Sequence, residues 1–301
     1  MQVGSRRAIL NPVSGSGDHA DYVRRLLAAR GFDVRETSGP EDAVSLGLEA
    51  GRDGVSELAV VGGDGTINEV LRGLAAADHF GSVTLSVVPT GTANILATQI
   101  GVQDVEQAVE VADTGETRTV DLGMADGQPF AVSCIAGLPA EASIAASSDL
   151  KARVGTLAFL VTGIQEAVEF EPLDIEVEAS TDESVERWAG EALCVLVGNA
   201  RKFVEEGGQA DLEDGLFDVA VVEQMPASNL VTEAIQHRLL GSGSENVAHF
   251  QATRVTVSDT NGDAITFSRD GEMSEHERLA FHVAPGAIDL RVGPGYESDP
   301  S

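Results

Sequence analysis

The first 120 residues alternate between short apolar runs and segments whose apolar residues recur at helical spacing, and this alternation restricts the fold most strongly. Buried strands are expected, in chain order, at RRAIL, FDVRET, ELAVV and SVTLSVVP. Helices are expected between and after them, at HADYVRRLLAARG, around 43–50, at TINEVLRGLAAA and at TANILATQIG. Strands that alternate with helices form a parallel sheet covered by helices on both faces. We therefore predict an α/β domain over residues 1–121.

The second half contains mostly strand-length apolar pieces separated by turns, from PFAVSCIAG to RLAFHVAPG. Helices are expected there only at about 150–168 and 227–240. This pattern is typical of a mainly antiparallel β-sandwich. We predict such a domain over residues 122–287, and a tail from about 288 to 301 that could return to the first domain.

The charge balance is strongly acidic. The formal net charge is -30, and only two of the 19 basic residues are lysines, Lys151 and Lys202. Such a surface repels nucleic acid and anionic membranes, so neither is expected as a charge-driven partner. An acidic, lysine-poor surface is also typical of proteins that work in concentrated salt, where screening shortens the range of self-repulsion to about 3 Å at 1 M. We interpret the charge as a halophilic adaptation.

Cysteine usage and the N-terminal residues favour a soluble cytoplasmic protein. Cys134 and Cys194 lie in apolar runs without CxxC spacing, so two buried free thiols are expected. The first residues lack the long apolar core of a signal peptide. The apolar segment 154–164 is too short to span a bilayer and is expected to be core, and its alternative role is to flank an apolar groove of the second half.

Three glycine-rich loops each follow an expected strand and precede an expected helix: NPVSGSG at 11–17, GGDGTIN at 62–68 and PTGTANILA at 89–97. Free backbone N–H groups and the positive end of a helix dipole meet at such loops, and glycine lets an anion approach closely. In a parallel sheet the three loops lie at one edge, which favours a shared nucleotide crevice. No Walker GxxxxGK[ST] motif or lysine occurs in them. Phosphate charge therefore has to be met by N–H groups, hydroxyls, arginine or Mg²⁺.

Asp64 lies in the middle of the second loop, where its carboxylate would repel a triphosphate. A divalent cation between the two removes this repulsion, so Asp64 is interpreted as holding Mg²⁺, directly or through water. The alternative role is the N-cap of the following helix.

The motifs NPVSG, GGDGTINEV and PTGTANILA, followed by VDLG, DGLFDV and RDGE, resemble the diacylglycerol kinase catalytic family. The resemblance is to its soluble bacterial-type lipid kinases, related to diacylglycerol and sphingosine kinases, and runs from Leu10 to about Leu290. It implies a phosphofructokinase-like nucleotide domain, a C-terminal β-sandwich and an active site between them. It also implies ATP and Mg²⁺ as cofactors and phosphoryl transfer from ATP to a lipid hydroxyl, by default that of diacylglycerol, in phospholipid biosynthesis.

The same resemblance implies an ATP pocket built mainly from the three loops. Its expected residues are Asn11, Ser14, Gly15, Thr37, Gly62, Gly63, Asp64, Gly65, Thr66, Ile67, Asn68, Gly91, Thr92 and Asn94.

The RDGE segment is catalytic by this resemblance, with Glu272 as the acceptor of the hydroxyl proton, Asp270 beside it and Asp64 on the nucleotide side. On an extended strand, residues two positions apart point to the same face, so both carboxylates would enter the cleft. The alternative is an exposed acidic turn. Asp121, in VDLG, is expected to join the acidic network around the catalytic Mg²⁺, and its alternative role is a hinge turn.

The segment QADLEDGLFDV resembles the structural Mg²⁺ loop of the family. Asp214 would supply the carboxylate, Asp211 and Leu216 would supply backbone carbonyls, and Asp218 is a further candidate. The alternative is an ordinary DG turn between strands.

Two departures from the family pattern fall in the second half and affect the acceptor more than ATP. Pro139 stands where related kinases usually carry an aspartate, and NARKFVEEGGQA replaces a glycine- and proline-bearing stretch around Gly207. The expected partner is a lipid hydroxyl substrate, with at most transient membrane contact and a homodimer left open. An NAD kinase, a sugar kinase or a nucleotide-binding protein without catalysis are the alternatives.

Overall fold

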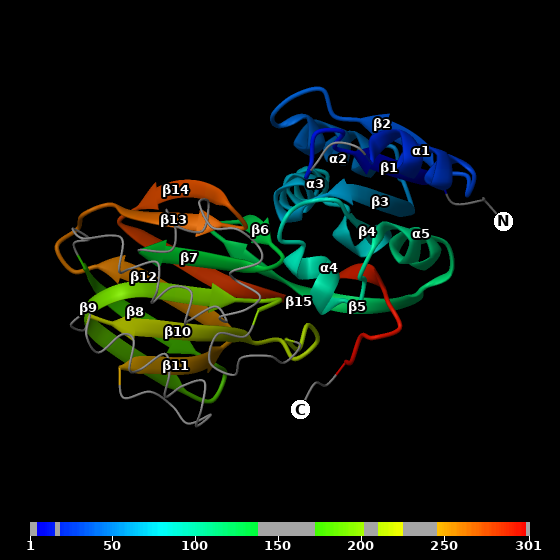
Figure 1. The fold of residues 1–301 in the computed structure, drawn as a ribbon. Coiled ribbons are helices and arrows are strands. Elements are labelled where there is room, and N and C mark those ends of the chain that lie inside the picture. Colours follow the sequence, from blue (N-terminus) through cyan, green and yellow to red (C-terminus); the bar gives the residue numbers. More distant parts are fainter. Residues whose placement is uncertain (1–4, 16–18, 138–171, 202–209, 225–245, 299–301) are drawn as a thin grey trace.

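The computed structural model describes residues 5–15, 19–137, 172–201, 210–224 and 246–298. They form two lobes, one that carries the described helices and one built of strands (Figure 1). The helices expected at about 150–168 and 227–240, with the apolar segment 154–164, lie outside the described residues, as does Pro139.

The N-terminal lobe confirms the predicted alternation. Its strands pair in parallel in the order β2–β1–β3–β4. They are β1 (Arg6–Leu10), β2 (Asp33–Glu36), β3 (Glu57–Gly62) and β4 (Thr84–Pro89). The helices are α1 (Ala20–Ala28), α2 (Asp42–Arg52), α3 (Asp64–Ala76), α4 (Ile95–Gln99) and α5 (Val105–Thr114), with a 3-10 turn at Phe80–Ser82. In β3 and β4 every residue after the first is buried, as expected for strands covered on both faces.

Two helices differ from the prediction. Helix α4 is shorter than TANILATQIG, because Asn94 has a left-handed backbone (φ 48°) and its side chain bonds the N–H and the carbonyl of Gly91. Helix α5 was not predicted, although Asp104 caps it by accepting a hydrogen bond from the Gln107 N–H.

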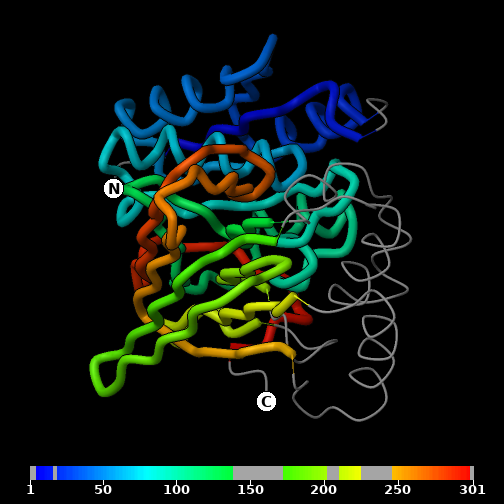
Figure 2. The backbone as a smooth tube through the Cα atoms, turned by 90° about the vertical axis from the view of Figure 1, so that its left-hand side faces the viewer, coloured from blue at the N-terminus to red at the C-terminus, as the bar shows by residue number. Residues whose placement is uncertain are grey.

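The second lobe is antiparallel, which confirms the β-sandwich prediction. Its strands include β8 (Leu173–Ser180), in which buried and exposed residues alternate, and β9 (Val185–Gly198); Figure 2 shows this hairpin as two adjoining green segments. The others are β5 (Glu116–Ala125), β6 (Gln128–Phe130), β7 (Ser133–Gly137), β10 (Phe217–Glu223), β11 (Val247–Ala252), β12 (Arg254–Asp259), β13 (Ile265–Arg269), β14 (Glu272–His276) and β15 (Arg278–Val292).

Strand β15 connects the lobes. Its first part pairs with β12, and near its end Asp289 and Leu290 pair in parallel with β4. Strand β5 runs antiparallel along β15, with an irregularity between Ala284 and Ile288. One 15-stranded sheet therefore passes through the described part of both lobes. The predicted boundaries at 121 and 287 fall inside β5 and β15, and they stay predictions.

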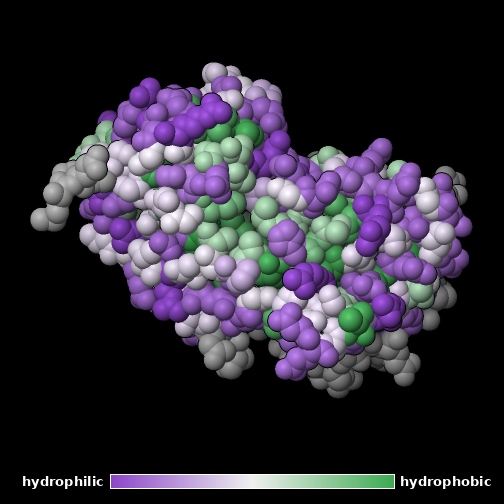
Figure 3. Space-filling model, turned by 180° about the vertical axis from the view of Figure 1, so that it is seen from behind, coloured by the Kyte–Doolittle hydropathy of each residue, from purple (hydrophilic) through white to green (hydrophobic). Residues whose placement is uncertain are grey.

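Each lobe has its own apolar core, and the cysteines lie in the second lobe. Cys134 and Cys194 are buried free thiols, as predicted, and burial raises the pKa of each to about 12. Seen from behind, apolar surface gathers between the lobes, whereas most of this face is polar (Figure 3). Among the described residues, no helix is both long and apolar enough to cross a membrane.

Candidate active site

The three glycine-rich loops meet at the carboxyl ends of β1, β3 and β4. The Asn11 Nδ2 donates a hydrogen bond to Thr66 Oγ1 at 3.0 Å, which joins the first loop to the second. Ser14 Oγ and Thr90 Oγ1 lie 2.6 Å apart and share a hydrogen bond, which joins the first loop to the third. Thr37 follows β2 at the same edge, where its N–H donates to the Leu10 carbonyl. The geometry thus brings the predicted nucleotide residues together.

Glycine is required where the loops touch. A Cβ atom on Gly91 would lie 2.5 Å from Gly63 Cα, and one on Gly15, which has a left-handed backbone (φ 57°), would lie 2.1 Å from the Thr90 carbonyl oxygen. Gly65 differs, because it is exposed and a Cβ there would meet nothing within 4 Å. Gly15 and Gly91 therefore allow the loops to touch. The first turn of α3 at Gly65 makes no such contact and stays open to a ligand.

Several of the predicted nucleotide residues already make contacts within the protein. Ile67 is 2% exposed and packs in the core, so only its main chain is left for a ligand. Asn94 holds Gly91, as described above, and Gly62 faces Thr66 across the loop. Thr92 is exposed.

Asp64 does not cap its own helix, because the N-cap of α3 is Gly63. Its two carboxylate oxygens accept hydrogen bonds from the Ile95 N–H at 3.0 Å and the Leu96 N–H at 3.1 Å. Asp64 therefore caps α4, which neither sequence interpretation anticipated. Each carboxylate oxygen can accept a further bond, so Mg²⁺ binding by Asp64 stays a prediction.

The RDGE segment is a hairpin turn, so the extended-strand argument for it was wrong. Strands β13 and β14 are joined by Asp270 and Gly271, whose φ values of 46° and 96° suit a two-residue type I′ turn. Asp270 and Glu272 therefore do not share one face of a continuous strand. They have separate partners.

The Asp270 carboxylate turns into the protein. It accepts hydrogen bonds from the N–H groups of Ala131 (2.8 Å), Val132 (3.1 Å) and Ser133 (2.8 Å), and from Asn68 Nδ2 at 3.3 Å. Burial raises its pKa to about 6, although the backbone hydrogen bonds lower it, and the charge of Asp64 adds to the rise. The contact with Asn68 puts this carboxylate at the end of the second glycine-rich loop, residues 62–68, which is the predicted phosphate loop.

Glu272 is held by arginines from both lobes. Arg72 of α3 pairs with Glu272 Oε1, and Arg269 Nη2 lies 3.2 Å from Oε2. Arg72 also reaches Glu41 at 3.3 Å. Both oxygens of the predicted proton acceptor are thus engaged by one arginine each, and each can still accept a further hydrogen bond.

Asp121 is buried between β5, the irregular part of β15 and the loop at 210–216. Its carboxylate accepts from the Gly286 N–H and from the Gly215 N–H, each at 2.7 Å, and its own N–H donates to the Leu212 carbonyl at 2.8 Å. Burial raises its pKa. The structure therefore places Asp121 against the predicted structural metal loop.

The metal loop itself is closed by its own carboxylates. Asp214 Oδ1 accepts from the Leu216 N–H and Asp211 Oδ1 from the Glu213 N–H, each at 2.8 Å. Asp218 lies on β10 and pairs with His249. No group of three His, Cys, Asp or Glu side chains suited to a metal occurs in the described ranges. The predicted site uses backbone carbonyls, so it stays a prediction.

The anchors of this loop were missed by sequence reasoning. Arg118 donates to both carboxylate oxygens of Glu213, at 2.9 and 2.6 Å, and the Tyr296 hydroxyl donates to Glu213 at 2.9 Å. Gln99 of α4 accepts from the Ala210 N–H at 2.7 Å. These partners are far apart in sequence, so no motif could have signalled them.

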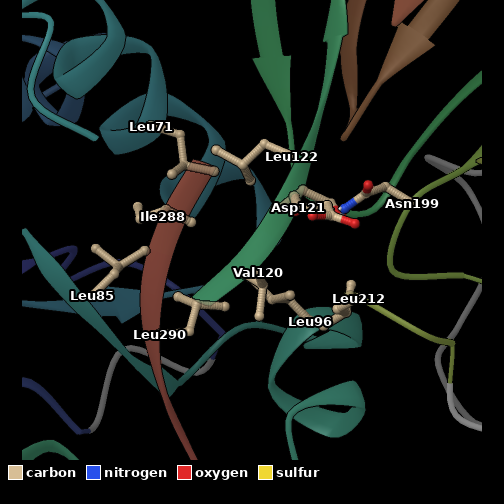
Figure 4. A pocket seen from close by; sticks show the side chains of 11 residues that line it. Leu71, Leu85, Leu96, Val120, Asp121, Leu122, Asn199, Leu212, Ile288 and Leu290 are labelled. Carbon is tan, nitrogen blue, oxygen red and sulfur yellow. Dashed lines mark hydrogen bonds between the residues drawn. The ribbon is translucent and has the colours of Figure 1, made fainter. Parts of the chain in front are cut away.

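A small cavity lies beside Asp121 and Asn199, with leucine side chains such as Leu71 and Leu290 directed toward it (Figure 4). Its volume is about 10 Å³, which is about the room that one water needs. It is too small for a nucleotide or a lipid. The cavity lies at the junction of the two lobes.

Comparisons with known proteins agree with this architecture. The family model for the diacylglycerol kinase catalytic domain matches residues 6–125, and that for the YegS C-terminal NAD kinase beta sandwich-like domain matches residues 132–292. A Pseudomonas aeruginosa protein named "Probable lipid kinase YegS-like" is 32% identical over 288 residues, with 91% of each chain covered. The "Diacylglycerol kinase" of Bacillus subtilis is 28% identical over 278 residues, which is 88% of this chain and 89% of that protein.

A solved structure shows the same fold. It is that of a diacylglycerol kinase from Bacillus anthracis, with a TM-score of 0.75 and 23% sequence identity over 98% of this chain and 99% of the other. The two matched segments together span nearly all of the chain. The chain therefore belongs to the lipid kinase family that joins a diacylglycerol kinase catalytic domain to a YegS-type C-terminal domain.

Proposed function

We propose that this protein transfers the γ-phosphoryl group of ATP to a hydroxyl of a diacylglycerol-like lipid. The observation that carries the proposal is the contact of Asn68, in the phosphate loop, with Asp270, in the RDGE hairpin. Through this contact an acidic residue of the second lobe lies beside the predicted phosphate loop, which supports the proposal. The names of the relatives, lipid kinase and diacylglycerol kinase, support this acceptor class.

The residues present fit a nucleotide with Mg²⁺. The open first turn of α3 at Gly65 offers N–H groups to phosphate, and Ser14 and Thr66 offer hydroxyls. Asp64, whose oxygens accept one hydrogen bond each, would hold Mg²⁺, and the loop with Asp211, Asp214 and Leu216 would hold a second, structural ion. When bound, Mg²⁺ neutralises charge on the phosphate oxygens.

Glu272 accepts the proton of the lipid hydroxyl in the proposed reaction. The hydroxyl oxygen forms a bond to the γ-phosphorus while the bond from the γ-phosphorus to the β–γ bridging oxygen breaks, and ADP leaves. Each oxygen of Glu272 bonds one arginine and has a further acceptor site for this proton. Asp270, fixed by three backbone N–H groups, keeps its carboxylate in one orientation at the crevice.

We further propose a cytoplasmic, salt-adapted protein that meets its lipid in transient membrane contacts, alone or as a homodimer. The net charge of -30 supports both the salt adaptation and the brief contact.

An acceptor screen tests the proposal. ATP consumption would be measured at high salt with Mg²⁺, with and without lipid diols, sphingoid bases, NAD and sugars, and phosphorylated lipid would be detected by mass spectrometry. Turnover that depends on one lipid class is the expected result. Turnover with NAD or a sugar alone, or ATP binding without turnover on any acceptor, would reject the lipid kinase proposal.

A further inference from the structure

One face of α3 contacts the RDGE hairpin at two points. Asn68 and Arg72 lie one helical turn apart on the same face of this helix. The Asn68 Nδ2 donates a hydrogen bond to Asp270 at 3.3 Å, and the Arg72 Nη1 donates one to Glu272 Oε1. Since α3 begins at Asp64, in the predicted phosphate loop, one helix connects that loop with both carboxylates of the hairpin.

The two arginines that hold Glu272 come from different lobes. Arg269 is the cross-strand neighbour of Glu272 in the hairpin, so it moves together with this carboxylate and fixes only its orientation within the second lobe. Arg72 belongs to the first lobe. Of these two contacts, only that of Arg72 therefore sets the position of Glu272 relative to the predicted phosphate loop.

The pair of Arg72 and Glu272 is partly shielded from water. The two side chains are 22% and 27% exposed, so solvent screens their attraction less than that of a surface ion pair. A second carboxylate of the first lobe steadies the arginine, because Arg72 Nη1 and Nη2 lie 3.3 and 3.4 Å from the two oxygens of Glu41. A planar guanidinium has enough donors to hold both carboxylates at once.

The contacts of Arg72 are with carboxylates and not with the first turn of its helix. Arg72 lies about 12 Å further along the axis of α3 than Asp64, at the usual rise per residue. A phosphate bound at the first turn would meet the N–H groups near Gly65. Arg72 is thus placed to act on the hairpin, and through it on the proton acceptor.

We propose that Arg72 is a positioning residue for the phosphoryl transfer, which ties Glu272 to the helix that begins at the predicted phosphate loop. The inference rests on the proposed kinase function and on the proposed role of Glu272 in it. Arg72 exchanges no proton and no group, since the proton passes from the lipid hydroxyl to Glu272. Its effect is on distance, because a general base has to lie within hydrogen-bond reach of the proton that it takes.

Steady-state kinetics with ATP and the lipid acceptor test this role. For Arg72→Gln we expect kcat to fall about 10- to 100-fold, the loss typical of a displaced catalytic group, while the KM for ATP stays within about twofold. Arg72→Lys keeps the charge but loses the planar fork, so its kcat should lie between those of Arg72→Gln and the wild type. Arg187→Gln is the matched control, because Arg187 also pairs with a glutamate, Glu178, but on the exposed surface of the sandwich. It should keep full turnover.

A double-mutant cycle with Glu272→Gln shows whether Arg72 acts through this carboxylate. If it does, adding Arg72→Gln to Glu272→Gln should lower kcat by less than about twofold further, since no base is left to position. A purely structural role of Arg72, or a direct contact with ATP, would give the full additional loss in the double variant. Single-turnover assays with excess protein measure these slow variants.

The outcomes separate this inference from the function on which it rests. If the wild-type protein phosphorylates a lipid and Arg72→Gln keeps its kcat, or the two losses multiply in the double variant, Arg72 does not position Glu272. If the wild-type protein phosphorylates no lipid, the kinase proposal fails, and the inference fails with it. Thermal unfolding shows whether each variant is folded at the assay temperature. Should Arg72→Gln be unfolded there, Arg72→Lys decides, and a kcat equal to that of the wild type rejects the inference.

Discussion

At the scale of single residues, Asp270 and Glu272 are held by different kinds of partner although they are two positions apart. Backbone N–H groups fix Asp270, whereas the side chains of Arg72 and Arg269 hold Glu272. Backbone donors in a packed segment cannot rotate away, but arginine side chains can. Glu272 is therefore the carboxylate that can change partners during a reaction, which agrees with its proposed role as proton acceptor.

Replacing Glu272 tests that role directly. In Glu272→Gln we expect turnover to fall about 10²- to 10⁴-fold, the usual contribution of a general base, while the dissociation constant of ATP stays within about twofold because the phosphate loop is untouched. Steady-state kinetics and calorimetry measure the two quantities. Glu275→Gln, an exposed position on the same strand, is the control and should keep full turnover. Equal activity of the two variants would remove Glu272 from the mechanism.

The residues that the sequence could predict are those whose motif is local. The DG turn at 270–271 has a local signal for a type I′ hairpin, and the loops at 11–15, 62–68 and 89–94 were recognised from glycine and hydroxyl residues after apolar strands. The pair of Arg72 with Glu272 spans 200 positions. No spacing rule reaches that far, so only the folded structure could reveal it.

At the scale of elements, α4 depends on a residue of another loop. It is five residues long, and its first N–H groups are bonded by Asp64. Its other end reaches the predicted metal loop, where Gln99 accepts from the Ala210 N–H. The predicted phosphate loop and the predicted metal loop are thus joined through one short helix.

Removing the Asp64 carboxylate should destabilise this connection as well as remove a candidate Mg²⁺ ligand. For Asp64→Ala we expect a loss of about 1 kcal/mol in the free energy of unfolding, as for other lost helix caps, together with weaker ATP binding. Asp104→Ala removes the cap of α5, away from the crevice, and should cost similar stability without affecting ATP. Urea unfolding and calorimetry give both values. If Asp64→Ala is as stable as the wild type, the capping role is wrong.

The loop at 210–216 should respond to pH and Mg²⁺ together. Partial burial raises the pKa of Asp214 to about 6 from an ordinary 3.8, so the folded protein binds this proton more tightly than the unfolded chain does. Without metal, its contribution to stability therefore falls as the pH rises from about 4 to 6 and stays low above that.

Asp214→Asn removes that titration and keeps an oxygen that can accept from the Leu216 N–H. In metal-free buffer at pH 8 we expect the variant to be more stable than the wild type by about 1 kcal/mol at most, since Asp214 is only partly buried and solvent screens its charge, with no advantage below about pH 4. Mg²⁺ should stabilise the wild type and not the variant. Thermal unfolding with and without Mg²⁺ is the measurement, and equal stabilisation of both proteins would contradict the metal site.

At the scale of the whole molecule, the sequence predicted two architectures and a tail from about 288 that could return to the first, but not which strands join the lobes. Alternation of strands and helices, and then of strands and turns, is visible along the chain. The pairing of β15 with both β12 and β4 is not, because strand pairing over long separations leaves no periodic signal. The contacts of Asp121 leave no periodic signal either. Its carboxylate accepts hydrogen bonds from the Gly286 N–H in β15 and from the Gly215 N–H in the 210–216 loop.

A continuous sheet predicts that the lobes unfold together. Trp188 is the only tryptophan and packs on the core of the second lobe, while the described helices lie in the first. Tryptophan fluorescence and far-ultraviolet circular dichroism should therefore give one shared transition in urea.

Asp121→Ala leaves two backbone N–H groups without an acceptor and should lower the free energy of unfolding by about 2 kcal/mol or more. We expect the transitions that the two probes report to separate in this variant. Asp289→Ala removes a solvent-exposed contact of the same strand pair, with Thr119, and should keep the shared transition. Separate transitions in the wild type, or a shared and unshifted transition in Asp121→Ala, would show that Asp121 does not couple the lobes.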